Sequence, residues 1–440
     1  MNYGAVLQAF ALQQAIQKKL HYENDIIDYQ SDKQKEMYSI FKKDTSVRSV
    51  VKNAAAAVYY PLLKKKKEVF DEFVNHRLKL TYTCSETEDV LRVVQKYDAA
   101  VCGSDQIWNT ELRDASEAYY LPGFKKKISY AASLGKKISD RSLEVLDQYI
   151  DEYQALSFRE KASIDTVKAK LGKDSELVID PVFLLTKEEW TETAGLNKTD
   201  KSTEKYIFLY SINYPDSFLK IVSALAKRMQ LPVVTAYGAH NITKGVKTQL
   251  KGIRVDYCAD PVKFLDYIQN ASLVVTDSFH GTAFSIIFHK EFMTYQSVKG
   301  DSSIRDERIA NLLETAGIEG NSLNDNHQPF ENRMNQTDWD QVDERISAVR
   351  EKSLNWLKES IEKAAGISRG EGKNIPVLYE KKEDCCGCGA CSVICPVQAI
   401  SMIEDEERFL YPKIDAEKCI GCHKCLSVCA FKADKEVVNS

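Results

Sequence analysis

The sequence predicts an α/β protein built from two doubly wound domains and a small cysteine-rich module. Short apolar segments alternate with helical patterns over most of the 440 residues, and this alternation is typical of parallel sheets covered by helices. Nine of the twelve cysteines lie from Cys385 onward, eight of them in two regularly spaced runs. The predicted divisions are 1–170 and 171–337 for the two α/β halves, 338–365 for a long amphipathic helix, 366–374 for a linker and 375–440 for the module.

The first half is expected to begin with a helix. Apolar residues at helical spacing follow Asn2, Tyr3 and Gly4 almost directly. The strand that would normally precede such a loop is expected either to be lost or to lie before the first residue given. A charged helical insertion is expected over 33–79. Strands are expected at 25–29, 97–101, 128–131, 155–157 and 177–179, and then, in the second half, at 206–210, 231–235 and 273–276.

Two polar segments each follow a predicted strand. Residues 102–109 (CGSDQIWN) come after strand 97–101, and residues 277–282 (DSFHGT) come after strand 273–276. In open parallel sheets, ligands bind beyond the carboxyl ends of the strands. Both segments are therefore expected to face a binding cleft.

The first polar segment offers groups suited to a sugar. Gly103 permits a close approach, and Ser104, Asp105 and Gln106 present short hydrogen-bonding groups. Trp108 could stack on the sugar ring. The alternative is a helix-capping network with Trp108 in the core, because Ser-Asp is an ordinary helix start.

The second polar segment is suited to an anion. A helix is expected to follow it, and the first turn of a helix offers unsatisfied N–H groups and a partial positive charge. His280, with Ser278 and Gly281 around it, would bind a phosphate when protonated or deliver a proton to a reacting carbon. The alternative is a histidine that caps the turn and packs.

Arginines are expected to hold the anion, because a guanidinium can grip a carboxylate or phosphate with two hydrogen bonds. The candidates are Arg159, after a short predicted strand, and Arg305 or Arg308, after a serine-containing loop. A surface ion pair is the alternative for each of them. Asp180 and Pro181 are expected to end a strand and turn the chain, which is an architectural role.

Composition limits the classes of binding partner and the cellular compartment that are expected. A net charge of −4 and a pI near 6.1 argue against nucleic acid, whose binding domains are strongly basic. The run Lys64 to Lys67 is expected to be a solvated helix face; the alternative is contact with an anionic glycan or a peripheral membrane surface. No apolar run approaches the roughly 20 residues of a transmembrane segment, and no leader opens the chain, so a cytoplasmic protein is expected. The scattered Cys84, Cys102 and Cys258 suit a reducing compartment.

The two cysteine runs have the spacing of a module with two [4Fe-4S] clusters. Three cysteines of each run hold one cluster, and the fourth ligates the other cluster. Zinc is the alternative, but two complete runs fit separated cysteine pairs poorly. Cys386 is expected to pack as a small apolar residue. The expected ligands are Cys385, Cys388, Cys391 and Cys429 for the first cluster, and Cys419, Cys422, Cys425 and Cys395 for the second. Residues 375–435 closely resemble bacterial two-cluster ferredoxins, with Ala430 in place of a second proline.

Ordered segments of the body also resemble one family. They are NYGAVLQAFALQ, YDAAVCGSDQIWN, ISYAASLG, SFREKASID, LVIDPVFLL and FLDYIQNASLVVTDSFHGTAFSIIFHKEF. Over residues 1 to about 317 the chain resembles the polysaccharide pyruvyl transferase family. The resemblance implies two Rossmann-like domains facing a cleft in a GT-B-like arrangement. It also implies phosphoenolpyruvate as the donor, a glycan as the acceptor and a ketal as the product. Asn2, Tyr3 and Gly4 would form the family's first loop at the cleft, and Arg308 matches a family block.

Three functional hypotheses follow. The first is a transferase that moves a pyruvyl group from phosphoenolpyruvate to a cell-surface or lipid-linked glycan. Because formation of a pyruvyl ketal is redox-neutral, the clusters have no evident part in that reaction. The second hypothesis is therefore an iron-sulfur protein that passes electrons to a redox partner protein, with the body as a scaffold or substrate-binding domain. The third is a glycosyltransferase that uses a nucleotide donor in the same cleft.

Overall fold

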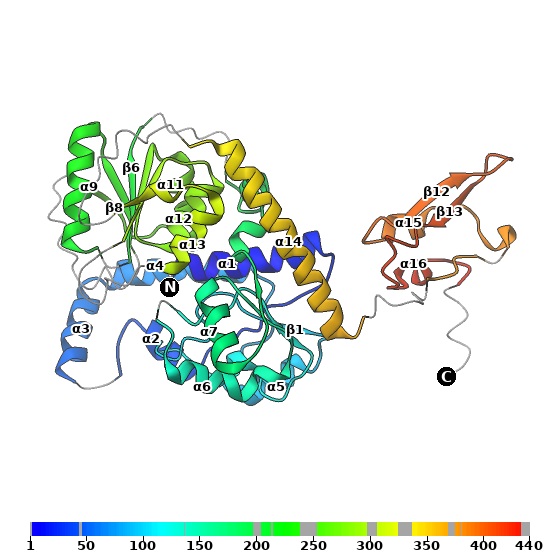
Figure 1. Ribbon diagram of the computed structural model, residues 1–440, viewed down its shortest axis with the longest axis horizontal. Coiled ribbons are helices and arrows are strands. Elements are labelled where there is room, and N and C mark those ends of the chain that lie inside the picture. Colours follow the sequence, from blue (N-terminus) through cyan, green and yellow to red (C-terminus); the bar gives the residue numbers. More distant parts are fainter. Residues whose placement is uncertain are drawn as a thin grey trace. The chain divides into compact units, whose positions relative to one another are not determined.

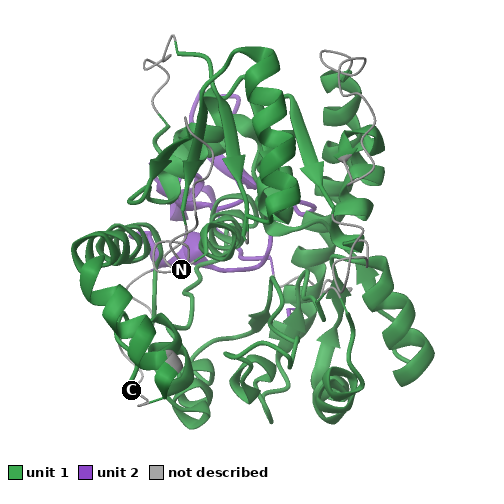
Figure 2. Cartoon of the chain, turned by 90° about the vertical axis from the view of Figure 1, so that its left-hand side faces the viewer, with its two compact units in different colours: residues 1–365 green, residues 366–440 purple. Residues whose placement is uncertain are grey.

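The structure is a computed structural model with two compact units, residues 1–365 and residues 366–440 (Figure 2). Each unit is described by itself. The structure describes residues 2–43, 46–135, 137–196, 204–212, 214–237, 253–296, 306–323, 337–367, 375–379 and 381–432. Arg305 and most of the predicted linker, residues 368–374, lie outside the described residues.

The first unit opens with helix α1, Tyr3–Gln14, which continues as a π-helical turn, η1, Ala15–Lys19 (Figure 1). Asn2 caps this helix, since its Oδ1 accepts a hydrogen bond from the Gly4 N–H at 2.9 Å. The expected helical insertion is confirmed as α2, Asp32–Tyr38, α3, Val47–Val58, and α4, Tyr60–Arg77. The expected strand at 25–29 is wrong as a continuous strand. It is extended, but it pairs with residues 80–84 only through two isolated bridges.

The amino-terminal half is built on short parallel strands. β1, Ala100–Cys102, β2, Lys127–Ser129, and β3, Tyr153–Ala155, form a sheet in the order β1-β2-β3. β4, Ser157–Phe158, pairs in parallel with β5, Glu176–Leu177. The helices of this half are α5, Thr87–Val94, α6, Asp140–Tyr149, and α7, Lys161–Leu171, with 3₁₀ turns η2, Glu117–Tyr120, and η3, Ile150–Glu152.

The carboxyl-terminal half contains a six-stranded parallel sheet in the order β11-β10-β9-β6-β7-β8. Its strands are β6, Ile207–Tyr210, β7, Val233–Ala236, β8, Ile253–Asp256, β9, Leu273–Thr276, β10, Phe292–Tyr295, and β11, Ser322–Leu323. Its helices are α8, Lys187–Thr193, α9, Asp216–Met229, α11, Pro261–Asn270, α12, Phe279–Ile287, and α13, Glu307–Ala316, with 3₁₀ turns η4, Pro181–Leu184, and η6, Glu319–Asn321. The central strands β6, β7 and β9 are buried along their whole length, as expected for parallel strands covered on both faces.

One long helix, α14, Trp339–Ala365, contacts both halves of the first unit. It packs against α13 of one half and against β2 and β3 of the other. The Ser353 hydroxyl accepts a hydrogen bond from the Ile179 N–H at 3.0 Å, and Arg350 Nε donates to the Phe183 carbonyl at 2.5 Å. These contacts tie the two halves together, so polar residues from both can form one site. The expected α/β fold class with Rossmann-like parallel sheets is confirmed.

The second unit is small and mixed. Strands β12, Ile400–Glu404, and β13, Leu410–Ile414, form an antiparallel hairpin. Three short helices accompany it: the 3₁₀ turn η8, Lys382–Asp384, and the helices α15, Ala390–Ile394, and α16, Lys424–Ser427. Across the described part of the chain, no helix has both the length and the apolar composition needed to cross a bilayer.

Candidate active site and cysteine module

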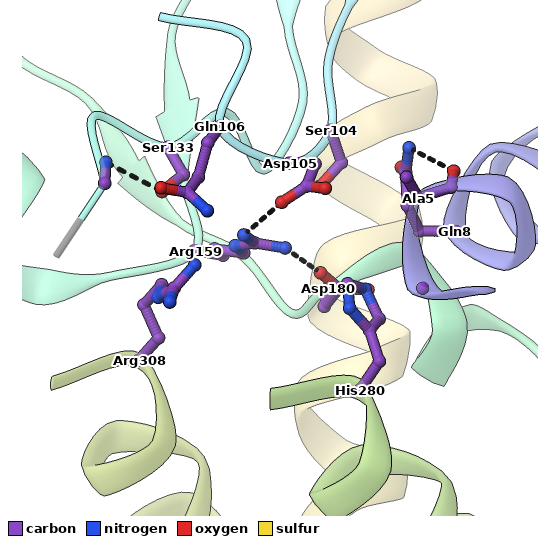
Figure 3. Close-up of polar contacts among 12 residues, drawn as sticks. Ala5, Gln8, Ser104, Asp105, Gln106, Ser133, Arg159, Asp180, His280 and Arg308 are labelled. Atoms are coloured by element: carbon purple, nitrogen blue, oxygen red, sulfur yellow. Dashed lines mark hydrogen bonds and ion pairs between the residues drawn. The ribbon is translucent and has the colours of Figure 1, made fainter. Parts of the chain in front are cut away.

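Four polar side chains from separate elements meet in the first unit (Figure 3). Arg159, just after β4, donates from Nη2 to Asp105 Oδ1 at 2.8 Å and from Nη1 to Asp180 Oδ2 at 2.5 Å. His280, in the first turn of α12, places Nε2 3.9 Å from Asp180 Oδ1. Asp180 is therefore the group that links Arg159 of one half to His280 of the other.

Local backbone structure holds these groups in place. Asp180 caps η4, because its Oδ1 accepts a hydrogen bond from the Val182 N–H at 3.1 Å. Ser278 caps α12 in the same way, through the Gly281 N–H at 3.4 Å. A Cβ on Gly281 would lie 2.3 Å from Thr276 Oγ1, so this position has room only for glycine. Ser278 and Gly281 thus shape the turn that carries His280.

The amino-terminal residues divide between the site and the core. A Cβ on Gly4 would lie 2.1 Å from His280 Nδ1, so the imidazole packs directly on the first turn of α1. Tyr3 lies in the core instead. Its ring stacks on Phe264 at 4.5 Å, and its hydroxyl donates to the Ala259 carbonyl at 2.9 Å. The structure therefore brings Gly4, but not Tyr3, to the polar cluster, and Asn2 serves as the helix cap.

Lys66 corrects the expectation for the lysine run. It is fully buried, and its Nζ bonds to the Tyr3 hydroxyl and, at 2.7 Å, to the Ala259 carbonyl. Burial lowers the pKa of Lys66 to about 8. The other three lysines of the run are exposed. The solvated helix face is therefore correct for Lys64, Lys65 and Lys67 and wrong for Lys66.

Arg159 is enclosed by carboxylates. Only 1% of its side chain is exposed. Burial opposes its charge, but Asp105 and Asp180 outweigh burial and raise the pKa of Arg159 above its ordinary value. Burial also opposes ionisation of Asp105, yet Arg159 and His280 lower the pKa of that carboxyl. Because its terminal nitrogens already bind protein carboxylates, Arg159 has only Nε left without a partner among the described residues.

His280 is buried and keeps one ring nitrogen without a partner. Nε2 makes no hydrogen bond within the described structure, and the residue is 7% exposed. Burial lowers the pKa of His280, while Asp180 and Asp105 oppose that shift. The imidazole is therefore neutral at neutral pH in the free protein. An anion placed beside it would favour the protonated form.

Two further ionisable residues flank this cluster. Arg308 holds Asp306 in a fork, with Nε–Oδ1 at 2.9 Å and Nη2–Oδ2 at 2.7 Å, and is 14% exposed. Glu160 is buried, bonds to the Ser133 hydroxyl and leaves Oε2 without a partner in the described residues. Burial raises the pKa of Glu160 to about 7, although Arg159 pulls it down. Sequence reasoning missed Glu160; its position next to Arg159 was the available signal.

The remaining members of the CGSDQIWN segment are mostly structural. The Ser104 hydroxyl donates to the Ala131 carbonyl at 2.9 Å and is buried. Trp108 is fully buried and stacks on Tyr120 at 5.9 Å, so it belongs to the core and is closed to a sugar. Gln106 accepts from Asn109 Nδ2 at 3.1 Å and is half-buried. Of this segment, Asp105 is the residue that joins the polar cluster.

The second unit repeats one cysteine loop twice. The Gly387 N–H points to Cys385 Sγ at 3.5 Å, and the Gly421 N–H points to Cys419 Sγ at the same distance. Both glycines have φ 67°, which favours glycine. A short helix, α15 or α16, follows each loop and carries the third cysteine of its run. Backbone N–H groups directed at sulfur stabilise thiolate ligands of iron-sulfur clusters.

A small hollow lies beside the second loop. Four cysteines line it together with apolar side chains: Cys395, Cys419, Cys422 and Cys425, with Pro396, Ile400 and Ile414. This group joins one cysteine of the first run to three of the second, which is the set that the spacing predicts for one cluster. Within the described residues, no three His, Cys, Asp or Glu side chains are close enough to hold a single metal ion. Cys386 is exposed, so the expectation that it packs is wrong.

Comparisons with known proteins agree with both parts of the chain. Residues 2–295 match the model of the polysaccharide pyruvyl transferase family, and residues 384–433 match a 4Fe-4S dicluster domain. Among curated proteins, one component of the Na⁺-translocating ferredoxin:NAD⁺ oxidoreductase complex of Acetobacterium woodii is 44% identical over 45 residues. That match spans 10% of this chain and only 12% of the length of that relative.

Solved structures with a similar body include two that hold UDP, one of them together with UDP-GlcNAc. The UDP complex of MnaA from S. aureus is 12% identical, with a TM-score of 0.47 over 82% of this chain and 95% of that one. The UDP-GlcNAc 2-epimerase of Methanocaldococcus jannaschii, in complex with UDP-GlcNAc and UDP, is 12% identical, with a TM-score of 0.43 over 78% and 90%.

Proposed function

The chain belongs to the polysaccharide pyruvyl transferase family, and we propose that it transfers a pyruvyl group from phosphoenolpyruvate to two hydroxyls of a glycan. Membership of that family makes it a transferase; the donor and the acceptor are the proposal. One observation supports it most strongly. His280 presents a buried Nε2 that has no hydrogen-bond partner in the described part of the chain, at the first turn of α12, where a helix also offers its own N–H groups to an anion.

The reaction balances without an oxidant or a reductant. The methylene carbon of the enol gains a proton and becomes a methyl group. The adjacent carbon forms a bond to one glycan oxygen, loses its bond to the phosphate oxygen, and bonds to a second glycan oxygen. Of the two hydroxyl protons released, one balances the new methyl hydrogen and the other leaves with phosphate.

We assign the proton transfer to carbon to His280. Its imidazole is neutral in the free protein because it is buried, and the charge of a bound donor raises its pKa so that it takes up a proton on binding. Asp180, 3.9 Å from Nε2, favours the same protonated state. Asp180 is thus a positioning residue for this step, in addition to its structural role as a cap.

Charged groups around His280 have distinct proposed roles. Arg308 is partly exposed and, among the described residues, is paired with Asp306 in a fork, so a donor carboxylate or phosphate can replace that partner. Arg159 offers its remaining Nε and keeps Asp105 ionised. Asp105, whose side chain is 23% exposed, is placed to receive the proton of an acceptor hydroxyl. Ser104 and Gln106 support the loop that carries it, and Ser278 and Gly281 the turn that carries His280.

We propose that the second unit carries two [4Fe-4S] clusters. Cys395, Cys419, Cys422 and Cys425 would hold one, as their shared hollow supports, and Cys385, Cys388, Cys391 and Cys429 the other. Bound clusters supply reversible electron transfer. Since pyruvyl transfer is redox-neutral, these cysteines would serve a separate exchange of electrons with a partner protein.

The test uses anaerobically purified, cluster-loaded protein. It is incubated with phosphoenolpyruvate and a panel of glycans, and phosphate release is measured with and without dithionite. We expect release that depends on a glycan and is equal in both redox states. Failure of every glycan, together with rapid cluster reduction by a ferredoxin, would favour an iron-sulfur redox protein over a transferase.

A further inference from the structure

Helix α3 turns its apolar side chains outward. Val47, Val50, Val51 and Val58 are 82%, 57%, 64% and 74% exposed, and they recur at helical spacing along one face. The opposite face carries small or polar side chains and points inward; its members are Ser49, Asn53 and Ala56. The Asn53 side-chain amide accepts a hydrogen bond from the Lys42 N–H and donates one to the Lys42 carbonyl. An ordinary surface helix shows the reverse arrangement.

Aromatic side chains extend this surface. Phe41, Tyr59 and Tyr60 are each more than a third exposed, and the rings of Phe41 and Tyr60 stack at 5.8 Å. These three residues and the four valines of α3 are called the α3 patch below. Tyrosine rings favour the boundary between water and lipid.

The charge around the α3 patch is strongly positive. Residues 41–67 contain eight Lys or Arg and one acidic residue, in a chain whose formal net charge is −4. Lys43, Lys52 and Lys65 are exposed. Lys64 and Lys67 pair with Glu68 and Asp71 on the same helix, but exposed pairs of this kind are weak and leave the region cationic.

We propose that the α3 patch binds the surface of an anionic bilayer. The valines and aromatic rings would enter the headgroup region, and the lysines would face the acidic lipids, which is the pattern of an interfacial amphipathic helix. A second copy of the chain fits less well as the occupant. A symmetric dimer through this patch would place two cationic segments against each other.

The patch is joined to the candidate site by contacts within the first unit. α4 follows α3 in the chain (Figure 1), and its Lys66 and Phe70 contact Tyr3, the residue before Gly4. Gly4 in turn packs on His280. If the proposed function holds, a bound membrane would present a lipid-linked glycan near the site. Membrane binding itself does not rest on that function.

The test is flotation of the full-length, cluster-loaded protein with lipid vesicles. We expect binding to vesicles of phosphatidylcholine with phosphatidylglycerol to exceed binding to pure phosphatidylcholine by about tenfold or more, and to fall as salt is added. The double variant Val50→Glu, Val51→Glu should lose about tenfold or more of that binding. The matched control, Tyr82→Glu with Leu112→Glu, replaces two residues with large exposed side chains in loops outside the α3 patch and should bind like wild type.

Several outcomes would overturn the proposal. The proposal fails if wild-type protein does not float with the acidic vesicles. It also fails if the Val50→Glu, Val51→Glu variant binds these vesicles as well as wild type does. A wild-type dimer that this variant converts to a monomer, without vesicle binding, would assign the patch to self-association. If the glutamate variant unfolds at a lower temperature than wild type, Val50→Ser with Val51→Ser must reproduce the loss. The substituted residues lie outside the His280 cluster. Each variant should therefore transfer pyruvyl groups to a soluble glycan at the wild-type rate, so the membrane proposal and the proposed function can fail separately.

Discussion

At the scale of single residues, the candidate site depends on two close contacts of His280. Gly4 leaves room for the imidazole, and Asp180 Oδ1 lies 3.9 Å from its Nε2. Neither contact can be read from the sequence, because Gly4, Asp180 and His280 lie on segments that only the tertiary fold brings together. What the sequence does supply is His280 itself, through its position between a strand and a helix.

Replacing Gly4 by alanine distinguishes the effect of His280 packing from the effect of α1 helix stability. Alanine is the better helix former by about 1 kcal/mol, so a merely structural α1 would be stabilised. A methyl group 2.1 Å from Nδ1 must instead displace the imidazole, and we expect turnover to fall by about a hundredfold, the usual scale for a misplaced catalytic group. Steady-state rates and melting temperature are measured together. Wild-type turnover in Gly4→Ala would refute the contact, and the same change in a His280→Ala background should be neutral or stabilising.

Glu160 should make stability depend on pH. Its pKa is raised from 4.5 to about 7 in the folded protein, so between these values the folded state holds a proton that the unfolded state has lost. Wild-type stability therefore falls as pH rises through this window. Glu160→Gln cannot lose that proton, and its stability relative to wild type should rise across the window by about 3 kcal/mol at most. Unfolding at pH values below and above the window tests this. If Glu160→Gln and wild type differ in stability by the same amount at both pH values, the prediction is contradicted. The same pH trend in the exposed control Glu144→Gln would also contradict it.

At the scale of elements, strands that precede polar motifs were predicted well. β9 was predicted at its observed residues, and β1 is displaced by a few. β8, β10 and β11 were missed. β8 is only partly buried and β11 has two residues, so neither has a clear apolar pattern, but β10 is buried along its whole length. The lysine run shows the limit of periodicity. Nothing in the sequence marks Lys66 as the buried member, because its partners Tyr3 and Ala259 are remote in the chain.

The two cysteine loops allow a test of which cluster each fourth cysteine ligates. Cys429→Ser should damage the cluster held by Cys385, Cys388 and Cys391, and Cys395→Ser the other one, because each fourth ligand crosses between runs. Wild type should carry about eight iron atoms per chain. Iron content and electron paramagnetic resonance of each variant are compared with those of Cys386→Ser, the exposed ninth cysteine, which should keep both clusters. Damage confined to the cluster of the mutated run would refute the crossed pairing.

At the scale of the whole molecule, the chain combines a transferase body with a cysteine module that its proposed reaction does not need. The family and the parallel α/β fold could be predicted from ordered sequence blocks, since these carry both the strand ends and the glycines that shape them. The charge balance of the site could not be predicted from the sequence. Arg159, expected to bind a substrate anion, is held by Asp105 and Asp180. This is why we propose Arg308 and the first turn of α12 as the main anion-binding groups.

The most direct test of the central claim is mass spectrometry of a glycan after incubation with phosphoenolpyruvate in heavy water, using wild type and His280→Gln. Wild type should add a pyruvyl ketal whose methyl group carries a single deuterium, with phosphate released in equal amount. His280→Gln should stay folded, keep its clusters and form the ketal about a hundredfold more slowly, the scale expected for loss of a positioned acid. A ketal without deuterium, phosphate release without addition to the glycan, or normal activity in folded His280→Gln would contradict the account.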